Sequence, residues 1–215
     1  RDVERSRGLG DVYKRQLIEA YLTGKELKTV AEIDASVSDL MTSARLYMYG
    51  LQFTYNPHRM ILNRVTDVYL LDADGNRREL EDDKLYRVVA DLYSGQMLSA
   101  VTKTSYGLLS VVPKKADGTP IENFEDVILT DNGGELKAWT AIAHYMESFP
   151  DENGDGIADI PQYYAGLHER KVVDDSANLI KLIKNPNKYA VMIAGVVLIV
   201  ILLVVLLIRL VLKLS

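Results

Sequence analysis

The chain has 215 residues and a formal net charge of −5 at pH 7, from 25 Lys and Arg against 30 Asp and Glu. Its charges are scattered and no basic face stands out, so we expect no nucleic-acid partner. Because the chain contains no cysteine, it has no disulfide, no thiolate metal ligand and no cysteine nucleophile. This length suits one domain, a connector and an anchor.

The first sixteen residues, RDVERSRGLGDVYKRQ, are charged and lack the apolar stretch of a secretory signal. Within them, GLGDVYKRQ resembles translated sequencing-adapter read-through, and the alternative is a disordered or helical arm. We interpret residues 1–16 as such an artefact or arm. On the first interpretation natural sequence begins near Leu17, and we expect protein to be missing before it.

The next part of the chain predicts a strand, a helix, a second strand and a hairpin. Residues 17–23 are strand-like, and apolar side chains at helical spacing predict a helix over 24–37. Tyr, Phe, Leu and Thr are frequent over 43–57, which predicts a strand that Asn56-Pro57 ends. Residues 63–80 predict a hairpin around the turn Ala73-Asp74-Gly75-Asn76.

Two further strands and a helix are predicted before residue 150. LYRVVADLYSG, residues 85–95, reads as a strand that ends at a glycine. Residues 98–114 contain more strand-like apolar positions, broken by Gly107 and closed by Pro113. An amphipathic helix is predicted over Glu135–Phe149. Its apolar face comprises Leu136, Trp139, Ile142, Ala143 and Met146.

A loop dense in Asp, Asn and Gly follows this helix and matches the first half of a calcium-binding loop. Its candidate ligands are Asp151, Asn153, Asp155 and Asp159, with Gly156 at the sharp turn. The bidentate Glu of a complete loop is replaced by Gln162, so we expect weak Ca²⁺ binding. The alternative is a solvated turn that ends the helix. Residues 164–184 then predict a polar, helical connector.

The run from Ala190 to Ile208, AVMIAGVVLIVILLVVLLI, contains no charged or strongly polar residue. At about 1.5 Å per residue it extends roughly 30 Å, the thickness of a bilayer's hydrocarbon core. Tyr189, Arg209 and Lys213 flank it as interface anchors do. The alternative is a buried helix, which would need a polar stripe that is absent. The sequence therefore predicts a transmembrane helix and a membrane as partner.

No complete active site can be assembled from these residues. His58, His144 and His168 are too scattered to form a ligand set. We find no G-x-S-x-G, P-loop or H-E-x-x-H motif, and no pair of carboxylates stands out as an acid and base. We therefore expect no catalytic residue within this chain.

Four signatures occur in order: YLTGKELK at 21–28, GLQFTYNPHR…NRV at 50–65, a D-x-DG hairpin at 72–75 and LYRVVADLYSG at 85–95. Together they resemble the C-terminal domain of the 5′-nucleotidase family over residues 17–150. The resemblance implies an α+β fold, a mixed sheet with hairpins packed by helices. The expected organisation is an arm over 1–16, this domain over 17–150, a connector over 151–188, a transmembrane helix over 189–208 and a tail over 209–215.

The family resemblance also implies where the chemistry resides. An N-terminal metallophosphatase domain, absent here, would carry two divalent metal ions and a catalytic Asn-His pair. The C-terminal domain would supply the wall that binds the nucleoside, with the base between two aromatic rings. Counting from Tyr86 and Val88 places the second ring at Tyr93, and the alternative is a core or packing tyrosine. The family's second glycine and downstream aspartate are absent from ADLYSGQM, residues 90–97, which puts a nucleotide substrate in doubt.

Two functions follow from these observations. The first is the substrate-binding part of a membrane-anchored 5′-nucleotidase-like phosphoesterase, with a nucleotide or related phosphoester as substrate. The alternative is a non-catalytic surface-display or adhesion module with a Ca²⁺-binding loop. Lys181, Lys184 and Lys188 precede the span and, counted alone, favour a cytoplasmic domain. Because the resembling family is exported, we expect a single-pass cell-membrane protein with its domain outside the cytoplasm.

Overall fold

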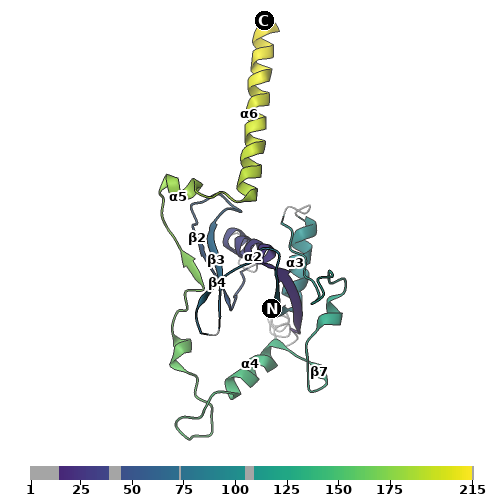
Figure 1. Cartoon of the computed structure of the whole chain (residues 1–215), viewed down its shortest axis with the longest axis vertical. Helices are drawn as coiled ribbons and strands as arrows, with labels where there is room; N and C mark the ends of the chain where they lie inside the picture. The colour runs from purple at the N-terminus through teal and green to yellow at the C-terminus, as the bar shows by residue number, and fades with distance from the viewer. Residues whose placement is uncertain (1–14, 39–44, 73, 105–108, 215) are drawn as a thin grey trace, which may run out of the picture. The chain divides into compact units, whose positions relative to one another are not determined.

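The structure, a computed structural model, describes residues 15–38, 45–72, 74–104 and 109–214 (Figure 1). Within these ranges the chain has the predicted α+β class and divides into two compact units. Unit 1 contains the residues up to Thr29 and Leu80–His168; unit 2 contains Val30–Glu79 and Glu169–Ser215. The arm or artefact expected over 1–16 falls almost entirely outside the described residues.

Unit 1 is built on an antiparallel pair of strands, β1 (Leu17–Thr23) and β5 (Leu85–Asp91). Alternate side chains of β1 are buried, as a strand with one covered face requires. Ile18 and Ala20 form a hydrophobic core with Ile121 and Phe124. The strand predicted over 17–23 is therefore confirmed, and the strand predicted over 85–95 is confirmed up to Asp91 and wrong beyond it, where a helix begins.

The remaining elements of unit 1 are short. They are α3 (Leu92–Thr104), the 3₁₀ turns η2 (Phe124–Val127) and η3 (Gln162–Ala165), the strands β6 (Thr130–Asp131) and β7 (Gly134–Glu135), and α4 (Ala138–Glu147). The prediction of strand over residues 98–114 is wrong for residues 98–104, because α3 occupies those positions. Gly107 lies outside the described residues. The predicted helix at 135–149 is confirmed over ten residues, none of them buried.

The helix α2 (Gly24–Val37) forms as predicted and explains the YLTGKEL signature. Thr23 Oγ1 accepts a hydrogen bond from the Glu26 amide, and the Glu26 carboxylate accepts one from the Thr23 amide at 2.8 Å. This reciprocal capping box satisfies two amides that the first helical turn leaves free. A Cβ at Gly24 would lie 2.3 Å from the Glu81 carbonyl oxygen, so a glycine is needed at this position.

Unit 2 contains a four-stranded mixed sheet in the order β4 (Arg77–Glu79), β3 (Val65–Leu71), β2 (Leu51–Tyr55) and β8 (Lys171–Val173). The hairpin of β3 and β4 is confirmed. Strand β8 pairs with β2 in parallel, which the sequence did not predict. The helical connector predicted over 164–184 is thus wrong for most of its length, and its helical part in unit 2 is α5 (Leu179–Ile183).

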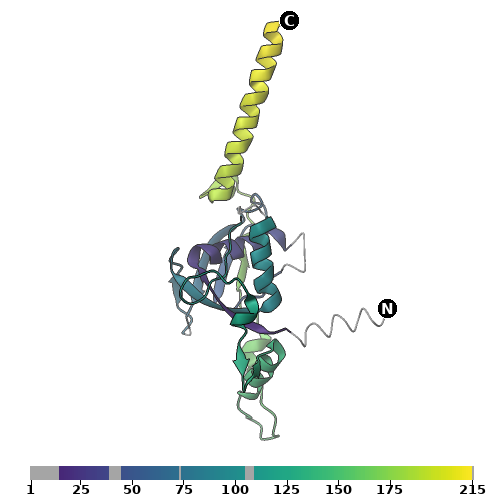
Figure 2. The same ribbon diagram turned by 90° about the vertical axis from the view of Figure 1, so that its right-hand side faces the viewer.

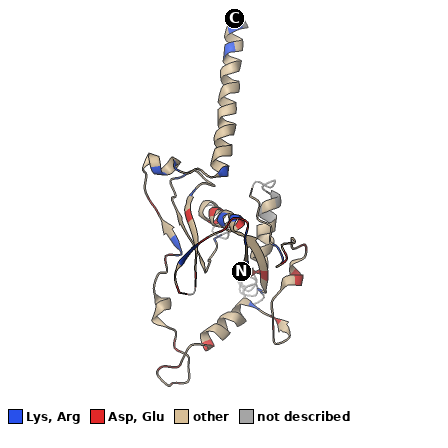
Figure 3. Cartoon of the chain, viewed as in Figure 1, with Lys and Arg blue, Asp and Glu red and all other residues tan. Residues whose placement is uncertain are grey.

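The last element of unit 2 is α6 (Lys188–Leu214), a helix of 27 residues. Its segment Lys188–Lys213 contains an 18-residue window with a mean hydropathy of 3.6 and, among the described residues, is the one helix long and apolar enough to cross a membrane. Figure 3 shows Lys and Arg at the two ends of α6 and none along its middle. Most of its side chains are about half exposed, and the helix extends away from the sheet of unit 2 in both ribbon views (Figure 2).

Candidate functional site

Tyr93, the predicted substrate-binding residue, lies in the first turn of α3 and not at the end of a strand. The helix begins here because the Asp91 carboxylate accepts hydrogen bonds from the Ser94 amide at 3.0 Å and the Ser94 hydroxyl at 2.7 Å. An Asp that binds the amide three residues later is an N-terminal helix cap. The strand-to-helix junction therefore fixes the backbone on either side of Tyr93.

Gly95 brings the first turn of α3 against the core of unit 1. A Cβ at this position would lie 2.4 Å from Ile18 Cδ1 and 3.1 Å from the Phe124 ring. The close approach requires a glycine and turns the opposite side of the helix outward. Tyr93 on that outward side is 58% exposed, and Met97, one turn further on, is 41% exposed. The tyrosine is therefore a surface residue whose ring is accessible to a ligand.

The predicted calcium loop is closed by its own hydrogen bonds. The Asp151 carboxylate accepts from the amides of Gly154 at 2.7 Å and Gly156 at 2.9 Å. These bonds, with that from Gly156 the strongest, lower the pKa of Asp151 below its ordinary value. Gly156 has φ +87°, the left-handed conformation expected of the glycine at the sharp turn.

The other predicted ligands also bind backbone amides. Asp159 accepts from the amide of Glu152 at 2.8 Å, and Asp155 accepts from that of Ile157 at 2.8 Å. Across the described ranges, no group of three or more His, Asp or Glu is placed so as to hold a metal ion. The arrangement observed is a chain of Asx turns. Calcium binding therefore stays a prediction. To coordinate Ca²⁺, these carboxylates would have to give up hydrogen bonds that they now accept from backbone amides.

The three histidines lie apart, as the sequence predicts. His58 is 2.7 Å from Asp175, and His144 is 3.6 Å from Asp131. His168 stacks on Tyr163 with ring centroids 4.1 Å apart. Each ring thus has a different local partner.

A cavity of about 360 Å³ in unit 2 was not predicted. Its floor is the Asp34 carboxylate, 2% exposed, which binds Lys171 Nζ at 2.6 Å and accepts a hydrogen bond from the Leu46 amide. The other lining residues are mostly aromatic or basic: Ala35, Ser38, Arg45, Tyr47, Met48, Tyr55 and Arg170. No sequence motif joins these residues, because Lys171 follows Asp34 by more than a hundred positions.

Part of the sequence matches a known family, and the structure is similar to several solved structures, among them a 5′-nucleotidase precursor and an NAD nucleotidase. Residues 11–101 match the family described as 5′-nucleotidase, C-terminal domain. A 5′-nucleotidase precursor from Thermus thermophilus shares 19% identity over 74% of this chain and 25% of its own, with a TM-score of 0.45. An NAD nucleotidase from Haemophilus influenzae shares 25% identity over 38% of this chain and 15% of its own, with a TM-score of 0.33.

The chain spans a quarter or less of the length of the two solved proteins. No curated protein gives a significant sequence match. The family match begins at residue 11, within the segment expected to be an artefact or arm, and ends in α3.

Proposed function

Because residues 11–101 match the 5′-nucleotidase C-terminal domain family, we propose that this chain is the substrate-binding portion of a membrane-anchored phosphoesterase. Its substrates would be nucleotide phosphomonoesters. The family match is the observation that supports this most strongly, because it runs without a break from β1 through β5 into α3. Both units contribute to the matched segment.

The phosphate chemistry would belong to an N-terminal metallophosphatase domain outside this chain. Two divalent metals in that domain would activate water for attack on the phosphomonoester. The residues of this chain would hold and orient the nucleoside, and such contacts contribute binding energy without an activated nucleophile.

Tyr93 is the residue that we assign to the base. Stacking of a base on an aromatic ring contributes about 1–3 kcal/mol. The ring of Tyr93 is exposed on a rigid junction, between the Asp91 cap and the contact of Gly95 with β1. The backbone that carries this ring is fixed before a ligand binds, so less conformational freedom remains to be lost on binding.

Helix α6 would anchor the protein. Its segment Lys188–Lys213 contains an 18-residue window with a mean hydropathy of 3.6, and none of that window is buried against the described residues. We propose a single pass through the cell membrane, with both units outside the cytoplasm and residues 209–215 inside it.

The second candidate function is a non-catalytic surface module, with Ca²⁺ bound by the loop at 151–159. The observation behind it is that residues 90–97, ADLYSGQM, lack the second glycine and the downstream aspartate of the resembling family. The sequence upstream of Leu17 discriminates between the two candidates. Metallophosphatase motifs there, D-x-H and G-N-H-[DE], support the enzyme, and a different domain supports the module.

Kinetics of the full-length protein test the proposal. We expect it to release phosphate from a nucleoside monophosphate only with a divalent metal, whereas the 215-residue chain alone hydrolyses nothing. Tyr93→Ala should raise KM roughly 5- to 150-fold with little change in kcat, because stacking acts equally on ground and transition states.

The matched controls are Tyr93→Phe, which keeps the ring, and Tyr163→Ala, which removes a ring 59% exposed in the same unit. Both should leave KM near its original value. An unchanged KM for Tyr93→Ala would contradict the assignment of this residue to base binding. Hydrolysis that is absent, or that needs no metal, would contradict the proposed phosphoesterase activity.

A further inference from the structure

The short helix α5 of unit 2 exposes its apolar side chains. Leu179, Ile180 and Ile183 are 76%, 73% and 74% exposed, while Leu182 is half-buried. Three large aliphatic side chains on five residues form an exposed apolar patch, and such patches mark sites that contact another surface. Four residues separate α5 from the start of α6.

One buried arginine holds the C-terminal end of α5. Arg59 is 6% exposed, and its guanidinium donates to the carbonyls of Lys181 at 2.9 Å, Lys184 at 3.0 Å and Asn63 at 2.6 Å. The two charge-assisted bonds to Lys181 and Lys184 hold the end of α5, and the bond to Asn63 holds the guanidinium within its own turn. The helix is therefore attached to the turn that follows β2.

The same turn holds the start of α6. The Asn187 side chain donates a hydrogen bond to the Leu62 carbonyl at 2.6 Å, and the backbone amide of Asn187 donates one to Asn63 Oδ1 at 3.0 Å. Asn187 Oδ1 in turn accepts from the amides of Tyr189 and Ala190, which caps α6. Both helices are consequently fixed to one segment, Arg59–Asn63.

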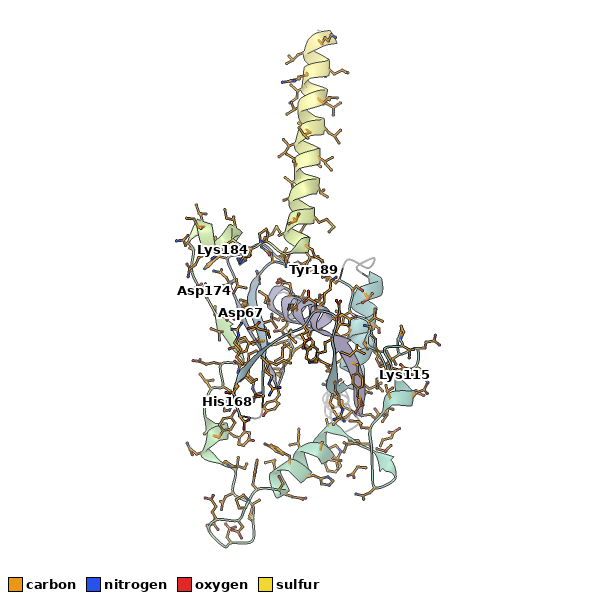
Figure 4. The ribbon with its side chains drawn as sticks, viewed as in Figure 1. Asp67, Lys115, His168, Asp174, Lys184 and Tyr189 are labelled. Atoms are coloured by element: carbon orange, nitrogen blue, oxygen red, sulfur yellow. The ribbon has the colours of Figure 1, made fainter. Side chains whose placement is uncertain are left out.

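This segment adds apolar and basic groups beside α5. Met60 and Ile61 are 38% and 44% exposed. Lys184 and Lys188 contribute positive charge, while Lys181 lies 3.5 Å from the Asp174 carboxylate. Figure 4 shows Lys184 and Tyr189 beside the base of α6. We call the following residues the juxtamembrane surface: Met60, Ile61, Leu179, Ile180, Ile183, Lys184 and Lys188.

We propose that the juxtamembrane surface binds the headgroup region of the bilayer that α6 crosses, with its aliphatic groups at the acyl boundary and its lysines on anionic phospholipids. The inference rests on the membrane anchoring proposed above. The apolar run of α6 begins at Ala190, which places the bilayer surface near Tyr189. The Arg59–Asn63 turn binds the start of α6 and the end of α5, so it keeps α5 near that surface. Short amphipathic segments with basic flanks bind membranes in this way.

Single-cysteine labelling tests the proposal in the full chain, which contains no cysteine of its own. The full chain is reconstituted in phosphatidylcholine vesicles with or without phosphatidylglycerol. An environment-sensitive fluorophore is placed at Ile180→Cys, at Val200→Cys within α6, or at Leu167→Cys, a control 98% exposed in unit 1. Spin labels on the lipid headgroup or deep in the acyl chain report depth.

We expect the fluorophore at residue 180 to shift to the blue and to be quenched by the headgroup label. The one at residue 200 should respond to the deep label, and the one at residue 167 to neither. If the fluorophore at residue 200 is quenched while the one at residue 180 is as exposed to water as the one at residue 167, the inference is overturned and the anchor stands. A probe at 180 that is shielded without lipid quenching would show a protein contact instead, and an unquenched probe at 200 would overturn anchor and inference together.

The lysines are tested with the probe at residue 180. Lys184→Gln combined with Lys188→Gln should abolish the extra blue shift that phosphatidylglycerol produces. Lys115→Gln, an exposed lysine of unit 1, is the matched control and should leave the shift unchanged. If the double variant keeps its full response to phosphatidylglycerol, the assignment to an anionic lipid surface is wrong.

Discussion

Thr23, Asn56 and Asp72 each follow or end a strand and use a short polar side chain to fix the next turn of backbone. Thr23 Oγ1 accepts from the amide of Glu26, Asn56 Oδ1 from that of His58, and Asp72 Oδ1 from that of Asn76. Each contact spans two to four residues, so a sequence motif contains both partners. This is why three of the four family signatures can be recognised in the sequence alone.

Glu26 makes the stability of unit 1 sensitive to acid. Its carboxylate accepts hydrogen bonds from Thr23, Val112 and Lys114. Burial raises the pKa of this carboxyl, but the hydrogen bonds together outweigh burial and bring the pKa below its usual value of 4.5. Because the folded-state pKa is the lower one, the stabilisation is present above about pH 4.5 and is lost as the pH falls through the folded pKa.

We expect Glu26→Gln to lower the free energy of unfolding by roughly 2 kcal/mol at neutral pH, because Lys114 loses its partner. The variant should also lose less stability than the parent between neutral and acid pH. Denaturant unfolding of the full chain in detergent, followed by circular dichroism, measures both effects. Glu122→Gln, which changes an exposed carboxylate of the same unit, is the control. Parallel pH profiles for parent and Glu26→Gln would contradict the assignment.

At the level of elements, the predictions succeeded where a pattern was local and long enough. The helix α2, the β3–β4 hairpin and the apolar run of α6 each have such a pattern. The prediction failed at α3, because residues 92–104 mix apolar side chains with polar ones and with β-branched residues from Val101 on, and because the Asp91–Ser94 cap that starts the helix lies inside the segment predicted as a strand. It failed at β8 because three residues have no measurable period, and their partner β2 lies more than a hundred positions earlier.

The loop at 151–159 gives a prediction at this scale. Millimolar Ca²⁺ should raise the melting temperature of the full chain in detergent, because a ligand that binds the folded state stabilises it. Asp155→Ala should abolish the shift, since it removes one of the expected oxygen ligands. Asp126→Ala, an acidic residue of η2 outside the loop, is the control and should retain it. Calorimetry without a binding signal at millimolar Ca²⁺ would leave the loop as a chain of Asx turns.

At the scale of the whole molecule, the fold class and the apolar run could be predicted, but the geometry of the sites could not. Tyr93 was found by resemblance, and its exposure depends on the contact of Gly95 with Ile18. The cavity above Asp34 combines residues 45–55 with residues 170–171, and no motif records that proximity. The bonds of Arg59 to α5 depend on tertiary structure, so no sequence motif contains both partners.

The anchor makes a prediction about the molecule in a cell. Expressed in bacteria behind a signal peptide, the full chain should stay in the membrane fraction after carbonate washing, since about 20 apolar residues insert stably. A version that ends at Asn187 should be soluble. Protease added to intact cells should remove residues 17–184. If both versions partition alike, α6 is not an anchor, and protection from protease would place the units on the cytoplasmic side.

The parallel pairing of β8 with β2 has a mechanical consequence. A tension applied through α6 reaches β8 from its C-terminal end, while the chain towards the N-terminus leaves β2 from its opposite end. The two strands are then pulled in opposite directions along their length, so their hydrogen bonds are stretched together and not one after another. With α6 in a bilayer as proposed, this short strand pair would resist fluid drag, or contact with a neighbouring surface, as a shear clamp.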